Sequence, residues 1–489
     1  MIREKISIAS VALALAGQVS CMAPKEESEG PYNVLFITVD DLGQRLGAYG
    51  DNQVHTPNID QLASRAALFE NAYCAIPICM GSRACALTGV HALSPNVKNG
   101  LRRADSQLGG ATALPKLLKG QGYYTISNGK VFHDRDDSED SWSEPAWRPQ
   151  IEGKKWLDPD SENYQKYSSY SFKDPKTKKR KKVEGYRGPI VEGADVPDSA
   201  YFDGKVLERS LIDLRRLKKK GQPFFLAVGF VKPHLPFYAP KKYWDMYDRE
   251  AIKVAGNTDK PLNLPKQVRG SREYTMYHHR NLADSTVEFH KMARHGYYAA
   301  VSYVDSLLGR LMDELKAQGL DKNTVVVFWG DHGFHLGEHS FWGKHNVMSN
   351  ALSIPMMVRM PGQEKSVRVS VPANASDLYP TVCELLGVTI PDHVGGNSLV
   401  PYFKGQGKPT QAGYSFARWQ GADVVMDGRY VYSEWRKEGK VIAKMLYNHK
   451  KDPEENNNVA HDPVYASTVK ELSKALDAER KHQATVYPK

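Results

Sequence analysis

Four short apolar runs constrain the fold of this chain more than any other feature of its sequence. They are rich in β-branched and aromatic residues and cover residues 33–39, 123–127, 224–230 and 325–329. Runs of this kind are typical of buried strands. Stretches of helical periodicity lie between them, and one apolar stripe comprises Val301, Val304, Leu308, Leu311 and Leu315. The alternation predicts an α/β fold with a large, mostly parallel sheet flanked by helices.

Each apolar run is followed within a few residues by side chains that carry chemistry. In chain order these are Asp40, Asp41, Lys130, His133, His234, Asp331 and His332. Sites in open α/β sheets collect at the carboxyl ends of the strands, so we expect these side chains to share one site. Taken singly, the same residues also fit solvated loops or helix caps. The adjacent carboxylates of Asp40 and Asp41 repel each other, and a bound cation is a natural resolution.

A cysteine and an arginine stand four residues apart in the segment from Cys79 to Gly89. If a helix begins here, Arg83 lies one turn past Cys79 on the same face. The helix N-terminus would add positive potential at the sulfur, which suits a nucleophile that attacks an anion. The alternative is a buried structural cysteine near a surface arginine, because a cysteine is reactive only when its surroundings activate it.

The same segment resembles the signature of the type I sulfatases, Cys-x-Pro-x-Arg followed by Leu-Thr-Gly. Gly81 departs from it, since the family has Pro or sometimes Ala there. Asp-His-Gly at 331–333 followed by Leu-Gly-Glu-His at 336–339 also resembles the sulfatases. Within the family, Lys-Pro-His-Leu-Pro-Phe at 232–237 and the pair Asp331-His332 resemble the iduronate-2-sulfatase-like branch. The resemblance covers nearly the whole chain after the N-terminal segment.

This resemblance implies an alkaline-phosphatase-like fold and a formylglycine-dependent hydrolase of sulfuric esters. In the family the cysteine, here Cys79, is oxidised by a sulfatase-maturating enzyme to formylglycine, whose hydrated aldehyde is the nucleophile. The ligands of a calcium ion would be Asp40, Asp41, Cys79, Asp331 and His332. Three carboxylates offer hard oxygen ligands, which favour calcium over zinc.

The resemblance also implies roles for the catalytic side chains. Arg83, Lys130 and Lys344 would supply positive charge to an anionic transition state. His234 would protonate the departing sugar oxygen, and His133 would take a proton from the second diol hydroxyl. The sequence leaves open which of the two histidines is the acid and which is the base.

A net charge of +10 indicates an anionic partner without distinguishing nucleic acid, a membrane surface and a sulfated glycan. The resemblance favours a sulfated glycan substrate and no nucleic acid. We expect an exo-acting enzyme that removes the 2-O-sulfate of a terminal uronic acid. One alternative is a phosphatase or phosphodiesterase on the same scaffold, although such enzymes usually combine Ser or Thr with zinc and many His ligands. The other is an inactive lipoprotein that binds sulfated glycans, because Gly81 departs from the signature.

The N-terminal segment, residues 1–21, has the pattern of an export signal. Arg3 and Lys5 precede an apolar run over 6–16 that is too short to span a bilayer. Cys21 ends a stretch that resembles a bacterial lipobox, which predicts a lipid anchor and a location in the periplasm or on the outer-membrane or cell surface. A plain cleaved signal peptide is the alternative. The five cysteines give no disulfide framework.

The remainder of the chain divides by its composition. We expect a catalytic domain over residues 30–400, with a polar insertion rich in Tyr and Lys over about 134–197. Beyond residue 400, short β-like pieces at 424–426 and 430–432 and a helix at about 469–481 predict a smaller C-terminal subdomain, 401–489, with an antiparallel sheet. Because contacts to the sugar come from loops, the insertion and this subdomain are the expected sources of substrate selectivity.

Overall fold

The computed structural model describes residues 31–98, 101–149, 188–404 and 413–487. The predicted export signal and most of the predicted insertion lie outside the described residues. From Tyr32 onward the chain forms one compact unit. In the described part of the chain, no helix is both long enough and apolar enough to cross a membrane.

A seven-stranded sheet forms the centre of this unit, in the order β12-β2-β11-β8-β1-β6-β4. The strands are β1 (Asn33–Val39), β2 (Ala67–Phe69), β4 (Tyr124–Gly129), β6 (Phe224–Phe230), β8 (Thr324–Gly330), β11 (Met356–Arg359) and β12 (Val367–Val369). The four predicted runs became four neighbouring parallel strands, with β1 between β6 and β8. The prediction of a mostly parallel sheet is confirmed, while β11 runs antiparallel to both of its neighbours.

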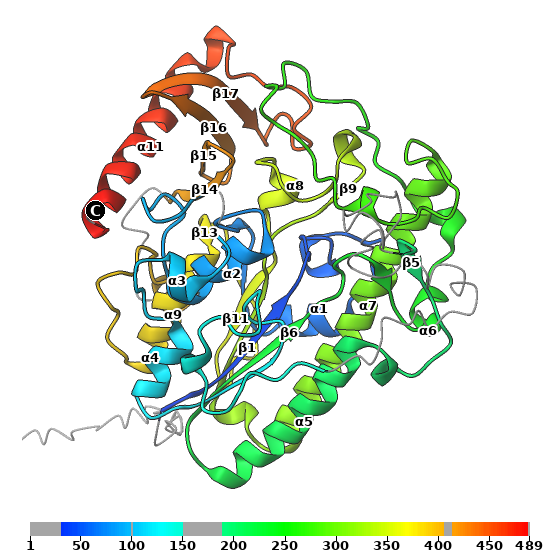
Figure 1. Cartoon of the computed structure of the whole chain (residues 1–489), viewed down its shortest axis with the longest axis vertical. Helices are drawn as coiled ribbons and strands as arrows, with labels where there is room; N and C mark the ends of the chain where they lie inside the picture. Colours follow the sequence, from blue (N-terminus) through cyan, green and yellow to red (C-terminus); the bar gives the residue numbers. More distant parts are fainter. Residues whose placement is uncertain (1–30, 99–100, 150–187, 405–412, 488–489) are drawn as a thin grey trace, which may run out of the picture. The chain divides into compact units, whose positions relative to one another are not determined.

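Helices cover both faces of this sheet because β1 is apolar on both faces. Leu35, Ile37 and Val39 pack in one core cluster with α1 (Pro57–Ala63), α5 (Phe202–Lys220) and α7 (Val287–Ala317). Val34 and Phe36 pack in the other with α2 (Cys79–Thr88), α4 (Leu114–Gly120) and α9 (Leu378–Leu386). Figure 1 shows α5 and α7 in green beside the central strands, and α2 and α4 in blue and cyan. The layering follows from the period-2 alternation of strand side chains.

A second, antiparallel sheet comprises β14 (Ser415–Trp419), β15 (Ala422–Met426), β16 (Tyr430–Lys437) and β17 (Lys440–Asn448). This bears out the antiparallel sheet predicted after residue 400. Helix α11 (Ala466–Val486) packs on one of its faces, as the red helix beside the orange strands of Figure 1. Residues of the other face, among them Ala417 and Met426, belong to the same core cluster as Val34.

Short elements complete the described chain. They are β3 (Ala72–Tyr73), β5 (Val191–Glu192), β7 (Phe237–Tyr238), β9 (His335–Leu336), β10 (Trp342–Gly343), β13 (Ala373–Asn374), α3 (Ala104–Gln107), α6 (Lys241–Trp244), α8 (Ser349–Leu352) and α10 (Val400–Phe403). Because β8, β1, β6 and β4 are parallel neighbours, their carboxyl ends lie along one edge of the sheet. The polar residues that follow these strands start from that edge.

Candidate active site

The two carboxylates after β1 are aimed apart by an unusual backbone turn. Asp41 has a φ of 59°, in the left-handed region that few residues other than glycine adopt. Two hydrogen bonds hold this turn: the Asp41 amide donates to Asp331 Oδ1 at 3.0 Å, and the Tyr297 hydroxyl donates to the Asp41 carbonyl at 2.9 Å. As a result Asp40 pairs with Lys130, whereas Asp41 pairs with Lys344.

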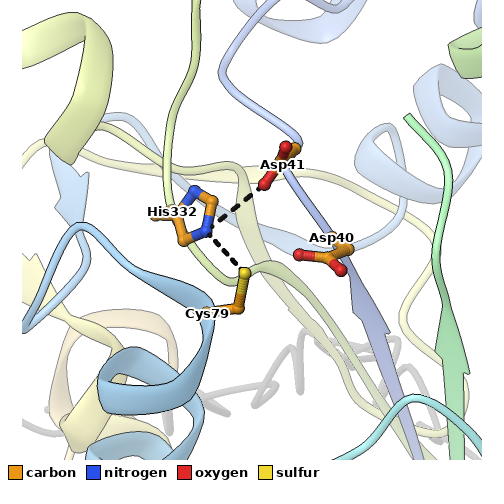
Figure 2. Close-up of side chains that lie close together, drawn as sticks. All are labelled: Asp40, Asp41, Cys79 and His332. Atoms are coloured by element: carbon orange, nitrogen blue, oxygen red, sulfur yellow. Dashed lines mark hydrogen bonds and ion pairs between the residues drawn. The ribbon is translucent and has the colours of Figure 1, made fainter. Parts of the chain in front are cut away.

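Four buried side chains converge beside this turn (Figure 2): Asp40, Asp41, Cys79 and His332. Each offers one ligand atom, and these atoms all lie within 4.8 Å of one another. His332 Nδ1 lies 3.0 Å from the Gly333 carbonyl, which only accepts, so this nitrogen carries the hydrogen. Nε2 therefore faces Cys79 Sγ at 3.4 Å and Asp41 Oδ1 at 3.3 Å. Burial lowers the pKa of His332, but Asp331 and Cys79 raise it to about 9, so Nε2 carries a proton that a bound cation would displace.

This cluster fits a divalent cation. Among the described residues, Asp40 Oδ1 is buried without a hydrogen-bond partner, and a buried carboxylate oxygen in that condition is costly. Two carboxylates that present hard oxygen donors are typical of a calcium or magnesium site, and a neutral imidazole nitrogen adds a further ligand. Cys79 Sγ marks the position from which an oxygen of a modified residue 79 would reach the same point.

Asp331 stands beside this cluster and not among its four members. Its Oδ1 accepts from the Asp41 amide, and its Oδ2 accepts from Arg83 Nε at 2.8 Å. The same carboxylate lies 3.6 Å from His332 Nε2. Each of its oxygens has a second lone pair, so these bonds leave capacity for a further partner.

Arg83 lies one turn past Cys79 in α2, as expected if a helix began there. Its side chain is fully buried, and besides binding Asp331 it donates to the carbonyls of Lys130 and, at 3.0 Å, Val131. These bonds tie α2 to the ends of β4 and β8. Arg83 thus positions Lys130 and Asp331 and lies 3.9 Å from Asp40 Oδ1.

The sulfur of Cys79 sits at the first residue of α2 in electropositive surroundings. Burial raises the pKa of the thiol, but the charges of Lys130, Lys344 and His332 and the nearby His133 lower it well below the usual value. The site is therefore built to hold negative charge at this position. Cys74 and Cys85, buried without such neighbours, have raised pKa values instead.

Two buried lysines contact the cluster, one at each carboxylate. Lys130 Nζ pairs with Asp40, and Lys344 Nζ lies 2.7 Å from Asp41 Oδ1. Burial lowers the pKa of Lys344, but Asp41, Cys79 and Glu273 raise it well above the usual value, so the amine stays charged. Lys130 directly follows β4 and Lys344 directly follows β10, and neither residue is more than 9% exposed.

The two histidines expected to move protons reach the site from different loops. His133 follows β4 and lies beside Cys79, and its Nδ1 is buried without a partner among the described residues. His234 follows β6, and its Nδ1 lies 2.6 Å from the Leu235 carbonyl. All the residues predicted for the site are thus gathered at the carboxyl edge of the sheet.

Three residues not predicted from the sequence complete the surroundings of His234. Lys232 is buried, and its ammonium donates to the carbonyls of His234 and Pro236. Asp203 accepts from the backbone amides of Val231 and Lys232 at 2.8 and 2.7 Å. Glu273 faces both His234 and Lys344 from an irregular segment. Lys232 lay inside the matched hexapeptide, whereas nothing in the sequence around Glu273 indicated its place.

Comparison with known families agrees with this geometry. Residues 32–388 match the family model described as Sulfatase. Residues 337–482 match a model described as the C-terminal part of N-sulphoglucosamine sulphohydrolase. The second match covers α8 and the whole antiparallel sheet.

Individual relatives agree with the family match. The chain is 32% identical over 389 residues to iduronate 2-sulfatase of Homo sapiens and 33% identical over 383 residues to that of Mus musculus. These matches cover 76% and 74% of this chain but 66% and 65% of the relatives, just under two thirds of their length. A sulfatase of Formosa agariphila is 30% identical over 462 residues, covering 91% of this chain and 86% of the relative.

A solved structure shares the fold at lower identity. The phosphonate monoester hydrolase of Agrobacterium radiobacter superposes with a TM-score of 0.72 at 24% identity, covering 92% of this chain and 96% of that one. This likeness concerns the fold and carries no information about the substrate.

Proposed function

This chain belongs to the sulfatase family, and from that premise we propose that it hydrolyses sulfate esters of a sulfated glycan. One observation carries the proposal: Cys79 lies at the start of a helix, between two buried lysines and within a cluster of carboxylates and an imidazole. Such a site stabilises negative charge at a nucleophile and on the group that it attacks.

Neither the nucleophile nor the cation is an amino-acid side chain as the gene encodes it. Formylglycine, made from Cys79 by a maturating enzyme, would supply a diol oxygen as the nucleophile. A calcium ion held by Asp40, Asp41 and His332, with Asp331 and residue 79, would polarise the sulfate oxygens. The fit of the buried ligand cluster supports this assignment.

The chain's own residues would then handle charge and protons. Lys130 and Lys344 hold a tetrahedral anion between them as negative charge develops on its oxygens. Arg83 keeps Lys130 and Asp331 in place by donating hydrogen bonds to the Lys130 carbonyl and to the Asp331 carboxylate. His234 gives a proton to the sugar oxygen as its bond to sulfur breaks. His133, beside residue 79, takes the proton that must leave before sulfate is released.

For the substrate we propose the 2-O-sulfate of a uronic acid at a chain end. Its support is the match to iduronate 2-sulfatase over most of this chain and the hexapeptide that carries His234. Cys79 and Lys344 are at most 4% exposed, which suits the entry of a terminal sugar better than the middle of a polymer. The net charge of +10 favours a polyanion, and the attraction weakens with salt.

The test is sulfate release from defined oligosaccharides that each carry one sulfate, using protein produced together with a maturating enzyme. We expect release from a terminal uronate 2-O-sulfate and none from the C79A variant. Mass spectrometry of the peptide containing residue 79 should show formylglycine in the active preparation. Release only from 6-O-sulfated hexosamine would overturn the substrate assignment, and an unmodified thiol in an active protein would overturn the nucleophile.

We propose that the protein is exported and anchored to a membrane through a lipid on Cys21. The basic residues, apolar run and lipobox-like stretch over 1–21 support this location. Metabolic labelling with a fatty acid should mark the protein but not its C21S variant. Equal labelling of both variants would contradict the anchor.

A further inference from the structure

We propose that Glu273 is a positioning residue, acting through His234, that keeps this histidine ready to protonate the departing sugar oxygen. The inference rests on the proposed sulfatase function and assigns a role within the same site.

The hydrogen on His234 can be assigned from its neighbours. Nδ1 lies 2.6 Å from the carbonyl oxygen of Leu235, and a carbonyl only accepts, so Nδ1 carries a hydrogen. Nε2 is then the nitrogen left to exchange a proton with the substrate. It has a proton to give only when the ring is an imidazolium, so the role of general acid requires the charged form.

Glu273 is placed to favour that charged form without taking its proton. Its Oε1 lies 3.6 Å from His234 Nε2, which is an ionic contact but longer than a hydrogen bond. Its Oε2 lies 3.2 Å from Lys344 Nζ. The side chain is 16% exposed, so solvent screens the interaction only partly. The contact with Lys344 holds the carboxylate where Nε2 faces it and leaves the Nε2 hydrogen available.

Other charges around the ring explain why a carboxylate is needed here. Lys344 repels a positive charge on His234, whereas Asp41 and Asp40 attract it until the proposed calcium ion offsets their charge. Burial lowers the pKa of His234, and Asp41, Glu273 and Asp40 together raise it against Lys344. Glu273 contacts both cations, so it reduces the repulsion between them as well as attracting each one.

The test compares E273Q, E273D, H234Q and the double variant H234Q/E273Q on the sugar sulfate that the wild type hydrolyses. Since general acid catalysis is worth about 10²–10⁴-fold, we expect E273Q to lose about tenfold or more in kcat with less change in KM. The double variant should be no slower than H234Q, and E273D should recover part of the rate. The control E288Q, which changes an exposed side chain at the start of α7, should match the wild type.

A second measurement uses 4-nitrophenyl sulfate, whose leaving group needs little protonation, and E273Q should lose less on it than on the sugar. Full additivity of E273Q and H234Q on the sugar sulfate, or no effect of E273Q, would overturn the inference. A wild type that releases no sulfate from any substrate would instead refute the proposed function. Thermal unfolding of each variant establishes that it is folded.

Discussion

Position 81 favours glycine because of a neighbouring side chain and not because of its backbone conformation. A Cβ built at Gly81 would lie 2.8 Å from Ile76 Cδ1 and 3.1 Å from its Cγ2. Ile76 thus occupies the room that Pro or Ala would need at this position. We predict that G81A costs about 1 kcal/mol of unfolding free energy, because overpacking exceeds the gain in helix propensity. In the I76V background the cost should fall by about 1 kcal/mol, measured by urea unfolding in a double-mutant cycle. Additive effects of the two substitutions would contradict this account.

Asp40 supplies the residue-scale prediction for the metal. Its Oδ1 is buried without a hydrogen-bond partner among the described residues and belongs to the four-residue cluster. We predict that D40N reduces bound calcium well below one per chain, measured by elemental analysis after dialysis. The control is D313N, which changes an exposed aspartate on α7. Full calcium occupancy in D40N would show that the cation lies elsewhere.

At the scale of elements, the buried carboxylate of Glu338 connects α7 to the segment after β9 through hydrogen bonds. It accepts from Arg294 of α7 and from Arg45, both at 2.7 Å, and from the Leu336 amide at 2.6 Å. Burial raises its pKa, but Arg45 and Arg294 lower it to about 2. Removing one partner of a buried pair is costly, so we predict that E338Q loses about 3 kcal/mol of unfolding free energy at pH 7.

The sign of the pH dependence follows from the lowered pKa of Glu338. The stabilisation is fully present above the unfolded value of 4.5 and is lost as the pH falls toward about 2. The difference between wild type and E338Q in urea unfolding should therefore shrink between pH 6 and pH 3, by roughly 1–2 kcal/mol. A difference independent of pH would contradict the assignment of the charge to Glu338.

At the scale of the whole molecule, the antiparallel sheet shares its core with the central sheet. Ala417 and Trp419 belong to the cluster that contains Phe36, and the Arg418 amide donates to the Ala75 carbonyl at 3.0 Å. Trp419 Nε1 also donates to the carbonyl of His345, next to Lys344, at 2.7 Å.

We therefore predict that residues 32–400 do not fold stably without residues 401–489. Each large apolar side chain left exposed costs about 1.5–3 kcal/mol, and a few of these exceed the net stability of a typical domain. Circular dichroism and gel filtration of the shortened chain should show loss of cooperative unfolding and association. A monomeric fragment that unfolds cooperatively would mean that the C-terminal region is an independent subdomain.

The sequence by itself determined the strands of the parallel block and the residues that follow them. Asn33–Val39 and Phe224–Phe230 have the predicted bounds, because a strand buried on both faces is apolar throughout and ends where polar residues begin. Parallel neighbours bring their carboxyl ends to one edge, so the sequence alone predicts that Asp40 and His332 lie together. The apolar stripe from Val301 to Leu315 indicates only the second half of α7, which begins at Val287, since its first turns are buried on most sides and show no one-sided stripe.

Only the tertiary structure decided the contacts made across space by irregular segments. Glu273 reaches His234 and Lys344 from a loop, and Ile76 fills the room beside Gly81. Such contacts depend on the path of a loop and on which side chain fills a gap. Neither produces a periodic pattern of apolar residues in the sequence, whereas burial of a strand or of a helix face does. The antiparallel direction of β11 could not be predicted from the sequence either, because strand direction is set by the connection through α8 and not by the composition of the strand.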